Sequence, residues 1–243
     1  MIKLAEDLFS LYERNEITIC EKYRGIVLDN LIADLSYTSP IMEGIVRTVF
    51  NSKKMMAFNL IQNAIDEAKG AARVRIIAER YADKELREKM LKHVNDEMNH
   101  SSMFAELVQY TGYEVETEDF SEHAEEINSV FDFDDDLKQF ICRVHSIEVR
   151  SWTMLRHYLN VLNELQDEKL LKMKPAIEKI MRDEINHVCY TGQTVSNWLE
   201  EDESLCQIFV ECINHTNKET WQDLTNMSQF MYDNIAEIMK EAA

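Results

Sequence analysis

Residues that favour turns are scarce in this 243-residue chain, which contains only 5 Gly and 2 Pro. A sheet of many strands joined by tight turns would need more of them, because Gly and Pro supply the backbone angles of such turns. Glu, Lys, Leu, Ala and Met, which have high helix propensity, are common instead. The composition therefore predicts an all-α protein.

Positively charged residues are also scarce, and the cysteines show no pattern of disulfide pairing. The formal net charge of −19 argues against nucleic acid or an anionic membrane surface as a partner, because both favour Lys and Arg. The 5 Cys are odd in number and form no Cys-x-x-Cys motif, so we expect reduced thiols and a cytoplasmic location. No run approaches the ~18 apolar residues of a membrane-spanning helix, and the acidic first residues lack the apolar centre of a signal peptide.

Hydrophobic periodicity predicts helices along most of the chain. They span residues 2–14, 17–34, 40–51, 54–81, 84–111, 135–165 and 174–200, with one or two closing helices over 203–240. The acidic, weakly periodic residues 113–133 predict a crossover connection with one short helix around 121–130. No linker rich in Pro, Gly or Ser is present, so we predict a single domain over residues 1–243. Tyr12 and Tyr23 belong to apolar stripes of the first two helices, where nothing indicates chemistry.

Two five-residue stretches in the long predicted helices are nearly identical. Residues 96–100 read Asp-Glu-Met-Asn-His, and residues 183–187 read Asp-Glu-Ile-Asn-His. Each contains Glu-x-x-His, and residues three apart on a helix lie on the same face. A carboxylate and an imidazole placed in this way can bind one metal ion together. The two candidate pairs are Glu97 with His100 and Glu184 with His187.

A further carboxylate precedes each of these stretches. Glu67 lies 30 residues before Glu97, and Glu148 lies 36 residues before Glu184. With a hairpin turn near residue 82, Glu67 and Glu97 each lie ~22 Å from the turn at a rise of ~1.5 Å per residue. The two carboxylates should therefore lie at the same level, and a longer connection in the second hairpin accounts for the wider spacing there.

Together these side chains predict a dinuclear metal site at the centre of the helices. Four carboxylates and two imidazoles would be costly to bury without compensation, and two divalent ions would balance the four negative charges. Oxygen-rich ligation with one His per ion suits iron or manganese, whereas structural zinc sites favour Cys and His. The predicted metal ligands are Glu67, Glu97, His100, Glu148, Glu184 and His187.

The ligand pattern resembles the ferritin-like di-iron carboxylate superfamily over roughly residues 54–200. In that superfamily the first and third helices of a four-helix bundle each supply a Glu, and the second and fourth each supply Glu-x-x-His. The resemblance implies a ferritin-like four-helix bundle core with additional N- and C-terminal helices. It also implies two Fe ions, or Mn in their place, with O2 as a co-substrate, and it is consistent with a homodimer.

The resemblance further implies a non-haem di-iron oxygenase or oxidase that oxidises a small organic substrate and takes electrons from a donor. The extra helices at both ends favour this function because they could enclose a substrate pocket. Iron handling or peroxide defence, as in rubrerythrin or bacterioferritin, is an alternative, and so is a dimanganese enzyme. A third hypothesis is a metal-free helical scaffold that binds a partner protein.

Four more residues accompany the predicted ligands. Asp96 and Asp183 resemble the Asp of the Asp-Glu-x-x-His motif in di-iron monooxygenases and ribonucleotide reductase small subunits, where it orients a ligand His. His93 and His145 each lie about one helical turn before a predicted ligand Glu. Both are candidates for an extra ligand, with a structural histidine as the alternative.

Overall fold

The computed structural model describes residues 3–31, 35–114, 136–165 and 167–241. Every regular element within these ranges is helical, which confirms the all-α prediction. The short helix predicted around 121–130 lies outside the described residues.

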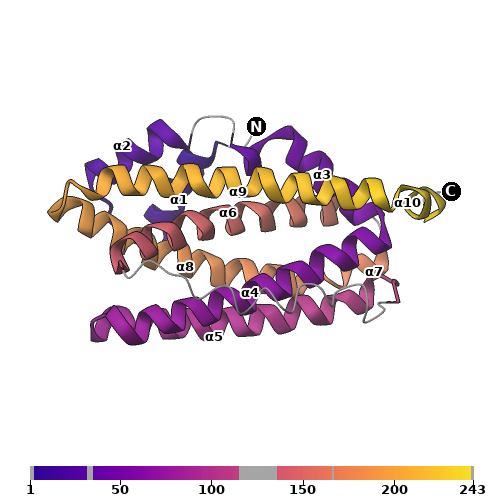
Figure 1. The fold of residues 1–243 in the computed structure, drawn as a ribbon, viewed down its shortest axis with the longest axis horizontal. Coiled ribbons are helices and arrows are strands. Elements are labelled where there is room, and N and C mark those ends of the chain that lie inside the picture. Colours follow the sequence, from indigo (N-terminus) through magenta and orange to yellow (C-terminus); the bar gives the residue numbers. More distant parts are fainter. Residues whose placement is uncertain (1–2, 32–34, 115–135, 166, 242–243) are drawn as a thin grey trace. The chain divides into compact units, whose positions relative to one another are not determined.

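The observed helices follow the predicted ranges closely (Figure 1). In chain order they are α1 (Leu4–Arg14), α2 (Glu21–Asn30), the 3-10 helix η1 (Ser36–Thr38), α3 (Pro40–Asn51), α4 (Lys53–Tyr81), α5 (Lys84–Leu107), the 3-10 helix η2 (Val108–Tyr110), α6 (Leu137–Glu164), α7 (Glu168–Leu171), α8 (Lys174–Glu201), α9 (Leu205–Asp233) and α10 (Ile235–Glu241). Pro175 lies in the first turn of α8, where proline is tolerated.

The helix predicted from residue 17 begins only at Glu21. Cys20 is its N-cap with an extended backbone, and the Cys20 Sγ accepts a hydrogen bond from the Tyr23 N–H at 3.4 Å. Because the cap is a thiol and not a Ser, Thr, Asp or Asn side chain, the usual sequence signal for a helix start is missing.

The polar residues 214–217 do not end a helix, since α9 continues to Asp233. A polar side chain of this stretch instead forms hydrogen bonds to another segment of the chain. The Asn217 Oδ1 accepts hydrogen bonds from the backbone N–H of Ser36 at 2.7 Å and from its hydroxyl at 2.8 Å. A polar run here marks a contact between α9 and η1 instead of a helix end.

Internal packing divides the chain into two compact units, each assembled from separate stretches of sequence. Unit 1 comprises Met1–Arg47, Lys138–Val161 and Ile177–Asn234, and unit 2 comprises Thr48–Leu137, Leu162–Ala176 and Ile235–Ala243. The first Glu-x-x-His motif belongs to unit 2 and the second to unit 1. The single domain stays a prediction.

In unit 2, polar caps fix the turn between α4 and α5, which lie side by side (Figure 1). The carboxylate of Asp83, the N-cap of α5, accepts a hydrogen bond from the Leu86 N–H at 2.9 Å. The Arg87 guanidinium donates to the carbonyls of Ala78 at 3.0 Å and Ala82 at 2.9 Å. These bonds satisfy carbonyls that the end of α4 would leave without helical partners, and they place the turn at the predicted position.

Unit 1 packs α6 and α8 with α1, α2 and α9. Arg156 of α6 pairs with Asp7 of α1 at 2.7 Å, and Arg143 of α6 pairs with Glu219 of α9 at 2.8 Å. Such partly exposed pairs contribute about 0–1 kcal/mol each, so apolar burial supplies most of the stabilisation. The fully buried apolar side chains of this unit include Leu8, Ile141, Ile180, Leu199 and Phe209.

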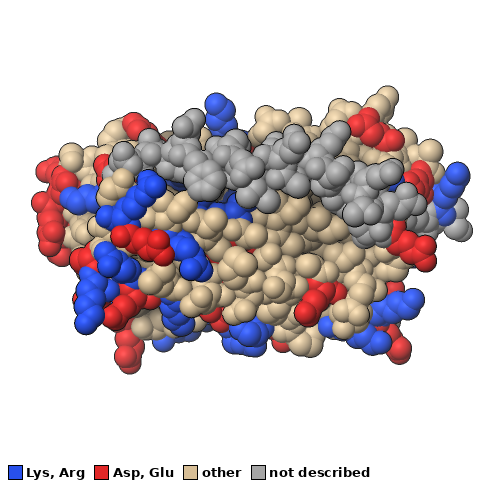
Figure 2. All heavy atoms as spheres, turned by 60° about the horizontal axis from the view of Figure 1, so that its bottom comes forward, with Lys and Arg blue, Asp and Glu red and all other residues tan. Residues whose placement is uncertain are grey.

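Charged side chains are mixed on the face drawn in Figure 2, where Lys and Arg lie among Asp and Glu without forming one basic patch. Within the described part of the chain, no helix combines the length and the apolar character needed to cross a membrane.

Gly192, in the middle of α8, allows α1 to approach closely. A Cβ at this position would overlap the Tyr12 hydroxyl and would lie 2.8 Å from the Tyr12 Cζ and 3.1 Å from the His145 Cε1. Glycine within a helix costs about 1 kcal/mol relative to alanine. The close approach of Tyr12 gives a structural reason for this cost.

Gly192→Ala should therefore lower the free energy of unfolding by about 1–3 kcal/mol, the usual effect of overpacking a filled core. Gly44→Ala is the matched control, because a Cβ there meets no atom within 4 Å. We expect it to leave stability unchanged or to raise it by up to about 1 kcal/mol. Chemical denaturation followed by circular dichroism measures both, and equal stability of the two variants would contradict the close approach.

Candidate metal centre

Three of the predicted ligands lie together in unit 2, and we call this group half-site A. It comprises Glu67 of α4 with Glu97 and His100 of α5, each offering one ligand atom within 4.8 Å of the others. Glu97 is 5% exposed and His100 is fully buried, whereas Glu67 is half-buried. The Ser101 hydroxyl donates to the Ala64 carbonyl at 2.7 Å and so holds α5 against α4 beside the ligands.

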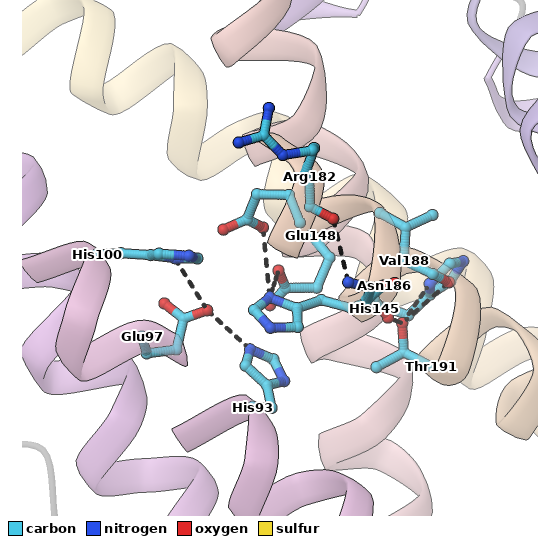
Figure 3. Close-up of polar contacts among 11 residues, drawn as sticks. His93, Glu97, His100, His145, Glu148, Arg182, Asn186, Val188 and Thr191 are labelled. Atoms are coloured by element: carbon cyan, nitrogen blue, oxygen red, sulfur yellow. Dashed lines mark hydrogen bonds and ion pairs between the residues drawn. The ribbon is translucent and has the colours of Figure 1, made fainter. Parts of the chain in front are cut away.

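His93 also belongs to the surroundings of half-site A. Its Nε2 lies 2.9 Å from the Glu97 Oε1, and the His100 Nδ1 lies 3.8 Å from the same oxygen (Figure 3). The Glu97 carboxylate is thus placed between two buried imidazoles. His93 is well placed to orient Glu97 by a hydrogen bond, while its role as an extra ligand stays a prediction.

The other three predicted ligands lie together in unit 1, and we call this group half-site B. It comprises Glu148 of α6 with Glu184 and His187 of α8, all buried. The His187 Nδ1 lies 3.6 Å from the Glu148 Oε2 and 3.7 Å from the Glu184 Oε2. Two ligand atoms ~2.1 Å from one ion are roughly 3–4 Å apart, so these distances suit the ligands of one metal ion.

The two half-sites have the same chemical composition. Each offers two carboxylates and one imidazole, with one carboxylate on the first helix of a pair and Glu-x-x-His on the second. A divalent ion would balance the two negative charges of each group and reduce the cost of burying them. Neither set contains a thiolate, and oxygen-rich donors with one imidazole suit iron or manganese. The residues therefore fit a metal ion, which would be held by Glu67, Glu97 and His100 in one group and by Glu148, Glu184 and His187 in the other.

The two aspartates of the repeated motif are both half-buried. The Asp183 Oδ2 pairs with the Lys179 Nζ at 2.7 Å on the same helix. This contact holds one carboxylate oxygen of Asp183 towards the exposed end of a lysine. A role of Asp96 and Asp183 in orienting a ligand imidazole stays a prediction.

His145 lies three residues before Glu148, yet both of its ring nitrogens have other partners. The Nε2 lies 2.5 Å from the Tyr23 hydroxyl, and the Nδ1 lies 2.9 Å from the Thr191 hydroxyl. Burial lowers the pKa of His145 to about 3, so the ring is neutral. These contacts disfavour the ligand role considered for His145.

The tyrosines around His145 are the functional candidates that the sequence did not reveal. Tyr12 and Tyr23 occupy the buried stripes of α1 and α2, as the apolar pattern predicted. Their hydroxyls lie 2.7 Å apart and face His145, which is more than 120 residues further along the chain. No local spacing indicates a contact of this kind.

Comparison of the chain with protein-family models, with curated proteins and with solved structures gives no match.

Metal binding should raise the thermal stability of the chain. At a free Mn²⁺ concentration about 100 times the dissociation constant, the gain should be about 2.7 kcal/mol for each ion bound, seen as a higher Tm. Glu97→Ala and His187→Ala each remove one ligand of a half-site and should reduce this shift. His215→Ala is the control, because that imidazole is half exposed and pairs with Glu219 at 3.0 Å. A full Mn²⁺-induced shift in both ligand variants would contradict the assignment.

Proposed function

We propose that the chain is a non-haem di-iron oxygenase or oxidase that uses O2 to oxidise a small organic molecule. The observation that carries this proposal is the pair of half-sites with identical composition, one around each Glu-x-x-His motif. The order of the ligands along α4, α5, α6 and α8 is the order in the ferritin-like superfamily. We therefore also infer a ferritin-like arrangement of these four helices.

When bound, two ferrous ions would supply the redox chemistry for O2 activation. An external donor would supply the electrons that each turnover consumes. The side chains of the chain itself perform the binding. In half-site A, Glu97 and His100 are supplied by one face of α5, and His93 contacts the Glu97 carboxylate. In half-site B, Glu148 and His187 are 6% and 2% exposed. This burial keeps bulk water from the ligands and strengthens their attraction for a cation.

The charge balance favours two ions per chain over one. Each half-site contains two carboxylates, and a divalent ion bound to one group would leave the charge of the other unbalanced. The internal repeat supports the same conclusion, because each copy carries a complete set of three ligands.

The test is to load the chain with Fe²⁺ under anaerobic conditions and to measure its iron content. O2 is then admitted, and its consumption and the Mössbauer spectrum of the iron are measured. We expect about two irons per chain, magnetic coupling between them after oxidation, and O2 uptake that rises with the correct substrate. Glu97→Ala and His187→Ala should each lower the iron content by about one ion per chain, while His215→Ala should retain both.

Other results would identify a different function. Accumulation of many irons per chain would support iron storage, and preferential Mn²⁺ binding with disproportionation of peroxide would support a dimanganese enzyme. Absence of bound metal would refute the proposed oxygenase or oxidase as well as the iron-storage and dimanganese alternatives. The helical scaffold that binds a partner protein would then remain.

A further inference from the structure

Two contacts that join α6 and α8 in unit 1 lie about one helical turn apart. The first is the ligand contact of half-site B, in which the His187 Nδ1 lies 3.6 Å from the Glu148 Oε2. In the second, the His145 Nδ1 lies 2.9 Å from the Thr191 hydroxyl (Figure 3). Earlier residues of α6 pair with later residues of α8, so the two helices are antiparallel and both contacts fix the same register between them.

The second contact lies close to the first along both helices. His145 is three residues before Glu148, or ~4.5 Å along α6. Thr191 is four residues after His187, or ~6 Å along α8. A slip of α8 by one residue would rotate both of its side chains by about 100°. The bond between His145 and Thr191 would then break together with the ligand contact, so this bond opposes any slip that separates the ligands.

The direction of the hydrogen bonds in the second contact follows from the Thr191 hydroxyl. Its single proton is donated to the His187 carbonyl at 2.6 Å, so its oxygen accepts the His145 Nδ1–H. Burial lowers the pKa of His145 to about 3, and the neutral ring therefore has no proton on Nε2. The Tyr23 hydroxyl, 2.5 Å from this nitrogen, donates to it.

Burial makes each of these bonds hard to replace. His145, Tyr23 and Thr191 are each at most 1% exposed. The Tyr12 hydroxyl, 2.7 Å from the Tyr23 hydroxyl, completes the chain of bonds. Because bulk water does not reach these groups, a lost partner would leave a buried donor or acceptor unsatisfied. His145 is therefore confined to the orientation in which it contacts Thr191.

We propose that His145 is a positioning residue that sets the metal affinity of half-site B by holding α6 and α8 in register through Thr191. The inference rests on the proposed function only in that half-site B must bind a metal ion. His145 does not ligate the ion in this role. It acts on the ligands through the two helices that carry them.

Half-site A obtains its register in a different way, which gives the proposal an internal comparison. The short turn between Tyr81 and Lys84 is fixed by the Asp83 cap. The connection between α6 and α8 is longer, from Glu164 to Lys174. A longer connection restrains the two helices less, so a buried bond between them has more effect on where their ligands meet.

The first experiment measures the Mn²⁺ affinity of each half-site separately by calorimetric titration of the full-length chain. Glu97→Ala leaves a complete ligand set only in half-site B, and His187→Ala leaves one only in half-site A. In the Glu97→Ala chain, adding Thr191→Val should weaken Mn²⁺ binding by about tenfold or more, as is usual for groups that orient metal ligands. In the His187→Ala chain, the same substitution should leave the Mn²⁺ affinity unchanged.

Two further variants separate positioning from general destabilisation. Thr191→Ser keeps the hydroxyl and should restore the Mn²⁺ affinity of half-site B. Thr220→Val is the matched control, because Thr220 is 3% exposed and donates to the Thr216 carbonyl at 2.8 Å on α9, which has no predicted ligand. It should leave Mn²⁺ binding unchanged.

Circular dichroism verifies that each variant is folded. Thr191→Ala, with its higher helix propensity, replaces Thr191→Val if that variant is unfolded. An equal loss of Mn²⁺ affinity in the Glu97→Ala and His187→Ala chains would overturn the inference, and so would an unchanged affinity of half-site B.

The second experiment uses the metal-free chain. Nitrogen NMR of isotope-labelled histidines should show His145 with a proton on Nδ1 and none on Nε2. A nuclear Overhauser contact between the His187 ring and the Glu148 side chain should weaken in Thr191→Val and persist in Thr191→Ser. A proton on Nε2, or an unchanged contact in Thr191→Val, would overturn the inference.

The two experiments keep this inference separate from the proposed function. Mn²⁺ affinity does not depend on O2 chemistry, so absence of oxygenase or oxidase activity would refute the proposed function and leave the inference intact. Failure of the unmodified chain to bind Mn²⁺ or Fe²⁺ would also refute the proposed function. The NMR measurements on the metal-free chain would then decide whether His145 holds α6 and α8 in register.

Discussion

Burial of carboxylates is the constraint on which the rest of this structure depends. Glu97, Glu148 and Glu184 are each at most 6% exposed, on helices where glutamate usually faces solvent. Burial of an ionised carboxylate is strongly unfavourable unless a cation or hydrogen-bond donors compensate. The buried imidazoles of His93, His100 and His187 provide part of this compensation, and a metal ion in each half-site would provide the larger part.

This constraint also explains the precision of the α4–α5 turn. A shift of one residue between the two helices would rotate Glu97 away from Glu67 by about 100°. The turn is held by the Asp83 cap and by the two hydrogen bonds of Arg87 to carbonyls near the end of α4. Away from the turn and beside the ligands, the Ser101 bond to Ala64 fixes the same register a second time. Local polar contacts thus define where the metal ligands meet.

The parts of the structure that the sequence predicted are those encoded by local patterns. The periodicity of residues 54–81 and 84–111, with a turn near residue 82, predicted the first hairpin, and the repeated motif with the carboxylates that precede it predicted the composition of both half-sites. Contacts between distant segments were not predictable in this way. The cap at Cys20 is local, but its thiol is not one of the usual capping side chains, whereas the hydrogen bond of the Ser36 N–H to Asn217 depends on which helices meet. The Tyr23–His145 contact depends further on side-chain rotamers, which no spacing rule supplies.

The two half-sites differ in the histidines that accompany their ligands. In half-site A, His93 contacts a predicted ligand, the Glu97 carboxylate. In half-site B, the position four residues before Glu184 is Ile180, and the nearby His145 lies on α6, where its two nitrogens contact the hydroxyls of Tyr23 and Thr191. Two ions with the same ligand types would therefore have different surroundings, and we expect them to differ in reduction potential.

The close fit of Tyr12 at Gly192 has a consequence for the order in which the protein folds. Tyr12 reaches His145, a residue 133 positions later in the chain. Contacts of such long range form slowly, because a long loop must close before they contribute any stabilisation. During synthesis α1 leaves the ribosome well before α6 and α8 exist. The part of its apolar face that packs against α6 and α8 must then remain uncovered until the second half of the chain has been made.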